Sequence, residues 1–175
     1  MIENSIYKNI RTVPDFPNEG INFKDITPLL MDSKLSSEII DAFIYKLKDL
    51  DVNAIVGVES RGFLFGFLLA NKMNIPFLPI RKAGKLPAET LKYSYDLEYG
   101  SAEIEIHKSD VKKGWNIFIH DDLLATGGTA CASAELIYKL GANIAGFGFV
   151  VGLSFLNGKE RLRKYTDNII VLKEY

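Results

Sequence analysis

The stretch Ile117-Phe-Ile-His-Asp-Asp-Leu-Leu-Ala-Thr-Gly-Gly-Thr129 contains the most informative pattern in the chain. Its apolar beginning predicts a buried strand, and its end predicts a glycine-rich turn that opens a helix. Gly127 and Gly128 allow backbone N–H groups to face an anion, and the N-terminus of the following helix favours negative charge. The stretch therefore predicts an anion-binding turn at the carboxyl end of a strand, where α/β folds bind their ligands.

Two adjacent carboxylates, Asp121 and Asp122, lie between this strand and the turn. Carboxylates accept hydrogen bonds from vicinal hydroxyl groups, and they also support a metal ion that such hydroxyls bind. Thr126 and Thr129 add hydroxyl groups to the turn. Together these residues predict a cradle for a phosphorylated sugar. The alternative is that the two aspartates merely cap the helix.

Strands and helices alternate on both sides of this stretch. Apolar runs predict strands over residues 53–58, 75–80, 115–120, 143–151 and 168–172. Apolar residues at helical spacing predict helices over residues 33–50, 61–73 and 128–140. This alternation is typical of an α/β fold with a largely parallel sheet. Pro76 and Pro79 place the second of these strands near a sheet edge or at strand ends.

The segment from Leu86 to Lys108 has a different character, because it is rich in Tyr and Glu. It alternates Ile104 and Ile106 with charged residues, which is typical of a strand with one exposed face. We expect an exposed antiparallel hairpin, or a mobile arm, beside the parallel core.

Length and composition narrow the possible functions. The 175 residues suffice for about one domain, and 21 basic against 22 acidic side chains give a net charge of −1. A neutral chain offers no general attraction to nucleic acid or to anionic lipid, and no apolar run approaches the ~18 residues of a membrane span. The one cysteine cannot form an internal disulfide, and with only two histidines it cannot complete a zinc site. We expect a cytoplasmic enzyme or binding domain.

Residues 117–129 resemble the 5-phosphoribosyl 1-pyrophosphate signature of the type I phosphoribosyltransferases. Residues 15–30, Glu59–Gly66 and Arg81–Pro87 narrow the resemblance to the members that use adenine, and Tyr95–Gly100 inside the arm extends it. The similarity runs from about Asp15 to the C-terminus, and the motifs occur in the order found in the family.

The resemblance implies an α/β fold of the type I phosphoribosyltransferase kind, with a mostly parallel sheet flanked by helices. One domain would span residues 1–175, with an N-terminal hood over roughly residues 1–32 and a flexible antiparallel arm over roughly 86–108. The implied reaction is purine salvage in the cytoplasm by a homodimer. It transfers the 5-phosphoribosyl group from 5-phosphoribosyl 1-pyrophosphate to N9 of adenine, giving AMP and pyrophosphate with Mg2+.

The resemblance also assigns residues to the sugar and its 5′-phosphate. Asp121 and Asp122 would hold the ribose hydroxyls. The turn that would hold the 5′-phosphate consists of Ala125, Thr126, Gly127, Gly128 and Thr129. Substrate oxygens and water would hold most of the Mg2+, with the two aspartates nearby.

The pyrophosphate would lie against two other segments. Glu59, Ser60 and Arg61 match the pyrophosphate loop, which often has a cis peptide between the positions of Glu59 and Ser60. Ser60 could also cap the following helix. Arg81, Lys82 and Lys85 form a basic cluster, which by its spacing alone is either a solvated turn or an anion clamp. The resemblance favours the clamp, reaching the pyrophosphate across a dimer interface.

The resemblance assigns catalytic roles to Arg61 and to Glu98 and Tyr99 of the arm. A carboxyl group that becomes buried when the arm closes has its pKa raised, which suits Glu98 to act as a general acid. From the residues alone, Glu98 could equally be an exposed hairpin residue. Arm closure would also exclude water that competes with adenine.

Adenine would stack on Phe23 of the hood, unless Phe23 is simply part of the core. Its neighbours Asn22 and Lys24 depart from the apolar residue and the arginine found in some members. His120 also departs from the usual aliphatic residue, and we expect a strand-end histidine with its hydrogen bonds satisfied. We expect Cys131 to be a small buried helix residue.

Two alternative functions remain open at this point. The acceptor could be another purine, such as hypoxanthine, guanine or xanthine. The chain could also be a non-catalytic regulator that senses the phosphoribosyl donor, although it has no room for an appended nucleic-acid-binding domain.

Overall fold

A computed structural model describes residues 1–96 and 100–175 of the chain. The elements in chain order are α1 (Ile2–Asn9), β1 (Arg11–Val13), β2 (Phe23–Asp25), α2 (Thr27–Met31), α3 (Ser33–Leu47), β3 (Ala54–Val58), α4 (Gly62–Met73), β4 (Phe77–Lys82), β5 (Thr90–Asp96), β6 (Ser101–His107), β7 (Asn116–Leu124), α5 (Gly128–Lys139), β8 (Asn143–Gly152), a 3-10 turn (Ser154–Leu156), α6 (Gly158–Leu162) and β9 (Ile169–Glu174). None of the helices in this described part is long and apolar enough to cross a membrane.

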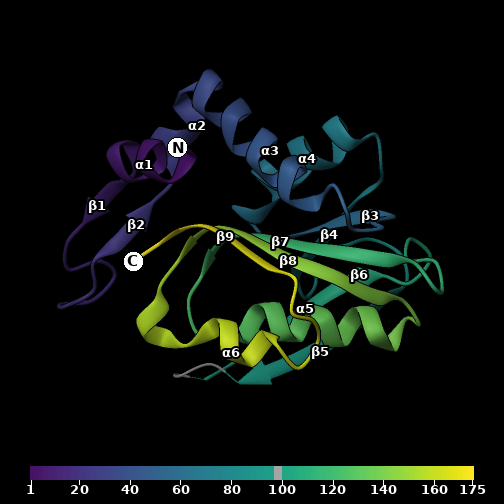
Figure 1. Cartoon of the computed structure of the whole chain (residues 1–175). Coiled ribbons are helices and arrows are strands. Elements are labelled where there is room, and N and C mark those ends of the chain that lie inside the picture. Colours follow the sequence, from purple (N-terminus) through teal and green to yellow (C-terminus); the bar gives the residue numbers. More distant parts are fainter. Residues whose placement is uncertain (97–99) are drawn as a thin grey trace.

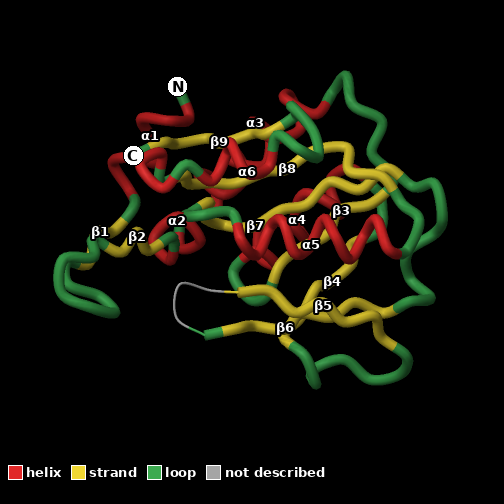
Figure 2. The backbone as a smooth tube through the Cα atoms, turned by 90° about the horizontal axis from the view of Figure 1, so that it is seen from below, coloured by secondary structure: helices red, strands yellow, loops and turns green. Residues whose placement is uncertain are grey.

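A sheet of seven strands in the order β5-β6-β4-β3-β7-β8-β9 forms the centre of the fold. The neighbours from β4 through β3, β7 and β8 to β9 all pair in parallel, whereas β6 pairs antiparallel with both β4 and β5. Figure 2 shows the strands running across the molecule with the β5–β6 hairpin at one side. The expected α/β fold with a mostly parallel sheet is confirmed.

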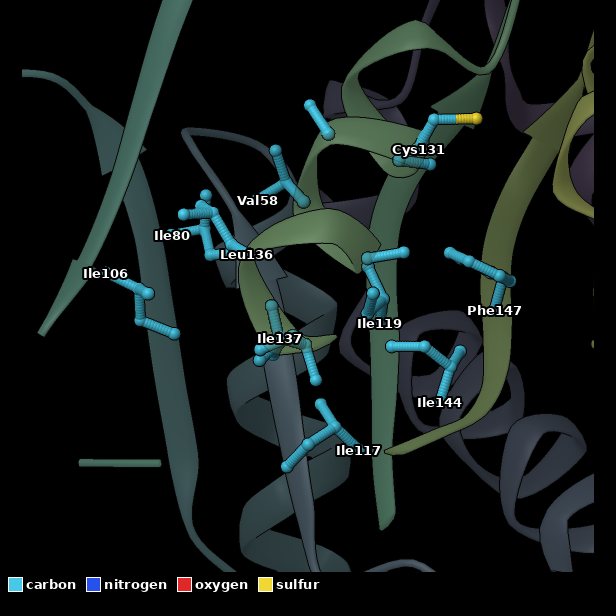
Figure 3. Close-up of a cluster of buried hydrophobic side chains, with 14 of the residues drawn as sticks. Val58, Ile80, Ile106, Ile117, Ile119, Cys131, Leu136, Ile137, Ile144 and Phe147 are labelled. Atoms are coloured by element: carbon cyan, nitrogen blue, oxygen red, sulfur yellow. The ribbon is translucent and has the colours of Figure 1, made fainter. Parts of the chain in front are cut away.

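Helices cover both faces of this sheet (Figure 1). Because side chains alternate along a strand, Val56 of β3 and Ile119 of β7 belong to the core shared with α5, whereas Ile55 and Phe118 belong to the core shared with α3 and α4. Figure 3 shows the first of these cores, where Leu136 and Ile137 of α5 lie among isoleucines of β6, β7 and β8. Burial on both faces explains why the parallel strands are continuous apolar runs.

β4, the strand that contains Pro79, lies inside the sheet, but its residues Phe77 to Ile80 have a neighbouring strand on one side only. β4 pairs with β3 from Phe77 to Ile80, but its contact with β6 is limited to Arg81 and Lys82. Pro79 therefore lies in the half of β4 that has a single strand neighbour. A missing N–H at that position breaks no ladder on the open side.

The arm is an antiparallel hairpin as expected, with Thr90 opposite His107 and Asp96 opposite Ser101. Its exposure was predicted wrongly, because β6 joins the central sheet and three consecutive residues of it, Ile104, Glu105 and Ile106, are buried. The two isoleucines pack in the core beneath α5, as Figure 3 shows for Ile106. The hairpin is therefore an extension of the sheet.

Residues 1–32, the segment expected to form a hood, contain α1, α2 and a second sheet made of β1 and β2. These two short strands pair antiparallel, with Val13 opposite Phe23. Ile6 of α1 and Leu29 of α2 are fully buried in the α3–α4 core. Those contacts attach the segment to the domain on the α3–α4 side of the main sheet (Figure 1).

Candidate active site

The carboxyl ends of β3 and β7 place two predicted groups of residues side by side. The two strands are parallel neighbours, so the segment after β3 meets the end of β7 at the same edge of the sheet. A cavity of about 290 Å3 lies there, lined by Glu59, Ser60, Arg61, Lys82, Asp121 and Asp122. The expected pyrophosphate loop, one lysine of the basic cluster and both aspartates are thus brought together.

Gly62 allows the two strand ends to come this close. A Cβ at Gly62 would lie 2.9 Å from the Asp121 Oδ1 atom and 2.9 Å from the His120 carbonyl oxygen. No side chain fits in that space, so α4 can begin directly against the end of β7 only with glycine as its first residue. The Glu59–Ser60 peptide bond before it is cis, as the resemblance implied.

Neither Ser60 nor the Asp121–Asp122 pair caps a helix, although the sequence left both roles open. The N-cap of α4 is Arg61 and the N-cap of α5 is Gly127, and neither helix has a capping side chain. Asp122 instead accepts a hydrogen bond from Arg61, with Nε 2.6 Å from Oδ2, and its side chain is only 5% exposed. The carboxylates are therefore available to the cavity rather than engaged at a helix end.

The surroundings of Asp121 shift the pKa of its carboxyl group. Burial raises the pKa of Asp121 well above its ordinary value of 3.8, and the neighbouring charge of Asp122 raises it further. The Asp122 backbone N–H donates to Asp121 Oδ1 at 2.8 Å, and this hydrogen bond works in the opposite direction. The raised pKa means that Asp121 holds a proton more readily than an isolated aspartate.

A carboxylate also organises the basic cluster. Glu59 accepts from Arg81 through two contacts of 3.3 Å and from the Lys82 backbone N–H at 2.9 Å. Burial acts to raise the pKa of Glu59, but these hydrogen bonds and the Arg81 charge outweigh it and keep the pKa below 4.5. Arg81 is thus turned toward Glu59. Lys82 lines the cavity, and Lys85 does not.

A second and larger cavity, of about 1010 Å3, lies beside the predicted phosphate turn. Four of the five predicted turn residues line it: Ala125, Thr126, Gly128 and Thr129. Its other lining residues come from the hood, the arm and the chain after β8, namely Gly20, Ile21, Asn22, Lys24, Asp96, Leu153, Phe155, Leu156, Arg161 and Tyr175. The arrangement places an anion-binding turn at one end of a mostly apolar cavity.

Helix α6 packs against the phosphate turn, a contact that no motif in the sequence predicts. Gly127 has a left-handed φ of +79°, and a Cβ there would meet the Gly158 carbonyl oxygen at 3.0 Å. A Cβ at Gly158 would in turn overlap the Ala125 carbonyl oxygen. Arg161 Nη1 donates to the Thr126 carbonyl oxygen at 3.1 Å, and its side chain lines the larger cavity. No motif indicated Arg161, because its partner is 35 residues away.

The arm reaches the same turn from the opposite side. The hydroxyl groups of Tyr95 and Thr129 are 3.0 Å apart, and Asp96 lines the larger cavity. Glu98 and Tyr99, to which the family resemblance assigned catalytic roles, lie outside the residues that the structure describes. Asp96 precedes Glu98 by two positions in the chain.

The three predicted base-binding residues point in two directions. Asn22 and Lys24 line the larger cavity, and Lys24 Nζ donates to Thr12 Oγ1 at 2.9 Å and lies 4.2 Å from the Tyr175 ring centroid. Phe23 is half-buried outside both core clusters, so the alternative of simple core packing is wrong. Its ring faces Arg61, whose guanidinium carbon lies 5.2 Å from the ring centroid.

The structure corrects the expectation for His120 and confirms that for Cys131. His120 is fully buried against Phe43, with ring centroids 5.2 Å apart, and neither ring nitrogen has a hydrogen-bond partner. Burial lowers the pKa of His120 to about 3; the nearby Gly148 backbone acts weakly in the opposite direction, but it makes no contact with the ring that has hydrogen-bond geometry. The sequence could not show this, because the residues around the ring come from other elements. Cys131 is buried in α5, and burial raises the pKa of its thiol.

Comparison with known proteins gives a consistent result. Residues 30–174 match the family model described as "Phosphoribosyl transferase domain". An adenine phosphoribosyltransferase of Clostridium botulinum is 47% identical over 167 residues, which cover 95% of this chain and 97% of that protein. The crystal structure of adenine phosphoribosyltransferase from Thermoanaerobacter pseudethanolicus superposes with a TM-score of 0.95 at 46% identity and covers 100% of both chains. The Saccharomyces cerevisiae adenine phosphoribosyltransferase, complexed with an imino-altritol bisphosphate and adenine, has a TM-score of 0.90 at 40% identity, covering 98% of each chain.

The fold and the paired strand ends define a phosphoribosyltransferase of the type I class. At this level of identity and coverage, the chain belongs to the adenine phosphoribosyltransferase family.

Proposed function

We propose that the chain transfers the 5-phosphoribosyl group of 5-phosphoribosyl 1-pyrophosphate to adenine, giving AMP and pyrophosphate in purine salvage. The observation that carries this proposal is the meeting of Glu59–Arg61 with Asp121 and Asp122 around one cavity, beside a second cavity that ends at an anion-binding turn. One ligand that spans both cavities must carry anions at two ends and hydroxyl groups between them. The phosphoribosyl donor has this form.

The subsites follow from the lining of the two cavities. Backbone N–H groups of residues 125–129 bind the 5′-phosphate at the start of α5, where the helix also favours negative charge. Asp121 and Asp122 accept hydrogen bonds from the ribose hydroxyls. Ser60, Arg61 and Lys82 bind the pyrophosphate, and adenine stacks on Phe23, while Asn22 and Lys24 line the neighbouring larger cavity.

Arg61 has to change partners when the donor binds. It is paired with Asp122 and lies over Phe23, so it covers both the proposed ribose carboxylate and one surface of the Phe23 ring. A pyrophosphate group attracts the guanidinium away from both. This movement exposes Asp122 to the ribose and the Phe23 ring to adenine.

Catalysis rests on stabilising charge as the bond to pyrophosphate breaks. The sugar becomes oxocarbenium-like, as in glycoside hydrolysis, while negative charge grows on the leaving group. Arg61 and Lys82 stabilise that negative charge, and the Asp121–Asp122 pair stabilises the sugar. Glu98, two residues after the cavity-lining Asp96, accepts the proton that adenine loses when N9 bonds to the ribose and returns it as a general acid in the reverse reaction, and Tyr99 helps the arm to exclude water.

The site fits one Mg2+ bound mainly through the substrate. In residues 1–96 and 100–175 no three potential ligand side chains cluster, and Asp121 and Asp122 are two adjacent carboxylates that line the smaller cavity. Mg2+ commonly takes one or two carboxylates together with substrate phosphates and water. When bound, the ion would offset negative charge on the pyrophosphate.

We further propose a homodimer formed through the outer face of α4. Leu64, Phe67 and Leu68 of this helix are 44%, 55% and 43% exposed, an apolar surface that a second copy of the chain would bury. Lys85, which lines neither cavity of its own chain, could then serve the partner's site. Buried Cys131 would stay reduced in the cytoplasm, where we place the reaction.

Steady-state rates with adenine, hypoxanthine, guanine and xanthine test the reaction. We expect turnover with adenine, and at most traces with the three oxopurines, whose carbonyl group replaces the amino group. Negligible turnover of adenine would overturn the proposal in favour of another acceptor. Donor binding without turnover of any of the four bases would favour the regulator.

A further inference from the structure

The carboxylate of Glu105 is hydrogen-bonded to the basic turn of residues 82–86 and does not line the cavity that contains Lys82. It is only 1% exposed, although it stands in a stretch of alternating isoleucine and glutamate where it would be expected to face solvent. Glu105 is on β6, directly opposite Arg81 of β4 in the antiparallel ladder. It therefore belongs to the strand pair from which the basic turn extends.

Every hydrogen bond of this carboxylate goes to the turn or to the base of the arm. One oxygen, Oε1, accepts from the backbone N–H groups of Lys85 and Leu86 at 2.8 and 2.9 Å. The other, Oε2, accepts from the Thr90 hydroxyl at 3.0 Å, where β5 begins. Burial acts to raise the pKa of Glu105, but these hydrogen bonds outweigh it and keep the carboxylate ionised.

The turn is thus held at both ends by carboxylates. Glu59 holds its start through Arg81 and the Lys82 N–H, and Glu105 holds its end through the N–H groups of Lys85 and Leu86. Arg81 also donates to the Lys85 carbonyl oxygen at 3.2 Å, which closes the turn on itself. Gly84 at its apex has a φ of +83° and no neighbour within 4 Å of a Cβ position, so no packing supports the apex.

Through these contacts Glu105 holds the end of the basic turn at Lys85 and Leu86. We propose that Glu105 is a positioning residue for the pyrophosphate subsite: it fixes the end of the basic turn at Lys85 and Leu86, as Glu59 fixes the start, and the two together keep Lys82 facing the leaving group. Its carboxylate does not touch the cavity, so it acts through the turn alone. This inference rests on the proposed function, because it takes the anion beside Lys82 to be the pyrophosphate of the donor.

The test compares two ligands that use different parts of the site. Isothermal titration calorimetry with magnesium pyrophosphate reports on the basic turn, and titration with AMP reports on the phosphate turn and the base cavity. For Glu105→Val, which keeps a strand-forming side chain, we expect the dissociation constant of magnesium pyrophosphate to rise about tenfold, the effect of losing roughly one charge-assisted hydrogen bond. The constant for AMP should change less than about twofold.

Three further variants make the test specific. Glu105→Gln should bind pyrophosphate within about threefold of wild type, because an amide oxygen can accept both N–H bonds and its NH2 can donate to Thr90. Glu103→Val, on the same strand with a 41% exposed side chain, is the matched control and should have no effect. In a Lys82→Gln background, Glu105→Val should add less than about a twofold effect, because both changes act on the same contact.

Several results would overturn the inference. Equal weakening of AMP and pyrophosphate by Glu105→Val would show general loosening, and unchanged pyrophosphate binding would show that the turn does not depend on Glu105. If Glu105→Val fails to fold, Glu105→Asp replaces it, since the shorter side chain cannot reach both N–H groups and the same selective loss is expected. A wild-type protein that binds neither ligand would instead contradict the proposed function.

Discussion

Arg61 and Asp122 form a short ion pair between two residues that bind different parts of the proposed donor. The Arg61 Nε atom is 2.6 Å from Asp122 Oδ2, and the same guanidinium lies over the Phe23 ring. The pair places one positive and one negative side chain in direct contact at the edge of the cavity. It also means that the ribose carboxylate and the pyrophosphate-binding arginine become available to substrate together.

The first prediction concerns Asp122→Asn. Affinity for 5-phosphoribosyl 1-pyrophosphate should fall about tenfold or more, because a charge-assisted hydrogen bond to the ribose is worth ~1.5–3 kcal/mol. Affinity for magnesium pyrophosphate alone should stay the same or increase, since Arg61 no longer has a carboxylate partner. Calorimetric titration of both ligands checks this. Asp41→Asn, which removes an exposed ion pair with Lys72, is the control. If Asp122→Asn lowers the affinities for the donor and for magnesium pyrophosphate equally, Asp122 contributes to binding the pyrophosphate rather than the ribose.

The second prediction concerns the arm. Glu98→Gln should slow turnover by about 10²–10⁴-fold if Glu98 transfers a proton, while leaving donor affinity nearly unchanged. Single-turnover rates and donor titration separate these two quantities. Glu89→Gln, which affects only an ion pair with Lys108 at the outer part of the same segment, should leave both unchanged. Unaltered turnover in Glu98→Gln would remove Glu98 from the mechanism.

The third prediction uses the contact between Arg161 and the phosphate turn. Arg161→Gln should weaken AMP binding about tenfold, because the turn loses a hydrogen bond to its Thr126 carbonyl and the cavity loses a cation. Binding of adenosine, which lacks the 5′-phosphate, should change little. Arg163→Gln is a matched control, since Arg163 is paired with Glu160 and does not line the cavity. If AMP and adenosine weaken equally, Arg161 does not act on the phosphate.

The fourth prediction concerns stability. His120→Leu should stabilise the fold by ~1–3 kcal/mol at pH 7, because it removes two buried ring nitrogens without hydrogen-bond partners. The gain should grow on acidification. The unfolded chain protonates His120 below about 6.5, whereas the folded protein does so only near about 3, so wild type loses stability as the pH falls between these values.

Urea unfolding at pH 7 and pH 5 measures this difference. Linkage predicts that the advantage of His120→Leu over wild type widens by about 2 kcal/mol between the two pH values. A constant difference would mean that the folded protein accepts the proton, and hence that the ring has a partner in solution. Activity at pH 7 should be retained, because the ring faces the α3–α4 core instead of the cavities.

The sequence predicted the parallel core well for a physical reason. Strands buried on both faces have to be apolar throughout, and β3 with its five consecutive buried residues shows this pattern directly. The motif at residues 117–129 was equally informative, because an anion-binding turn needs glycines and hydroxyls at neighbouring positions. Local requirements of this kind are visible in a single stretch of chain.

What the sequence could not predict depends on partners distant in the chain. Alternation in β6 indicated an exposed Glu105, and the turn that covers it comes about 20 residues earlier. Arg61 lines the cavity together with the two aspartates, but nothing in the sequence indicated that it would cover Phe23, 38 positions away. Such long-range contacts leave no periodicity in the sequence.

The close contact between α6 and the phosphate turn limits what can be concluded from motifs in related sequences. A chain can keep Ala-Thr-Gly-Gly-Thr intact and still lose the shape of this turn if Gly158 is replaced, because any Cβ there overlaps the Ala125 carbonyl oxygen. The residue that decides the outcome, Gly158, lies 29 positions beyond the end of the motif at Thr129. A relative with the full signature but a larger residue at this position should therefore be regarded as a candidate inactive homologue until its activity has been measured.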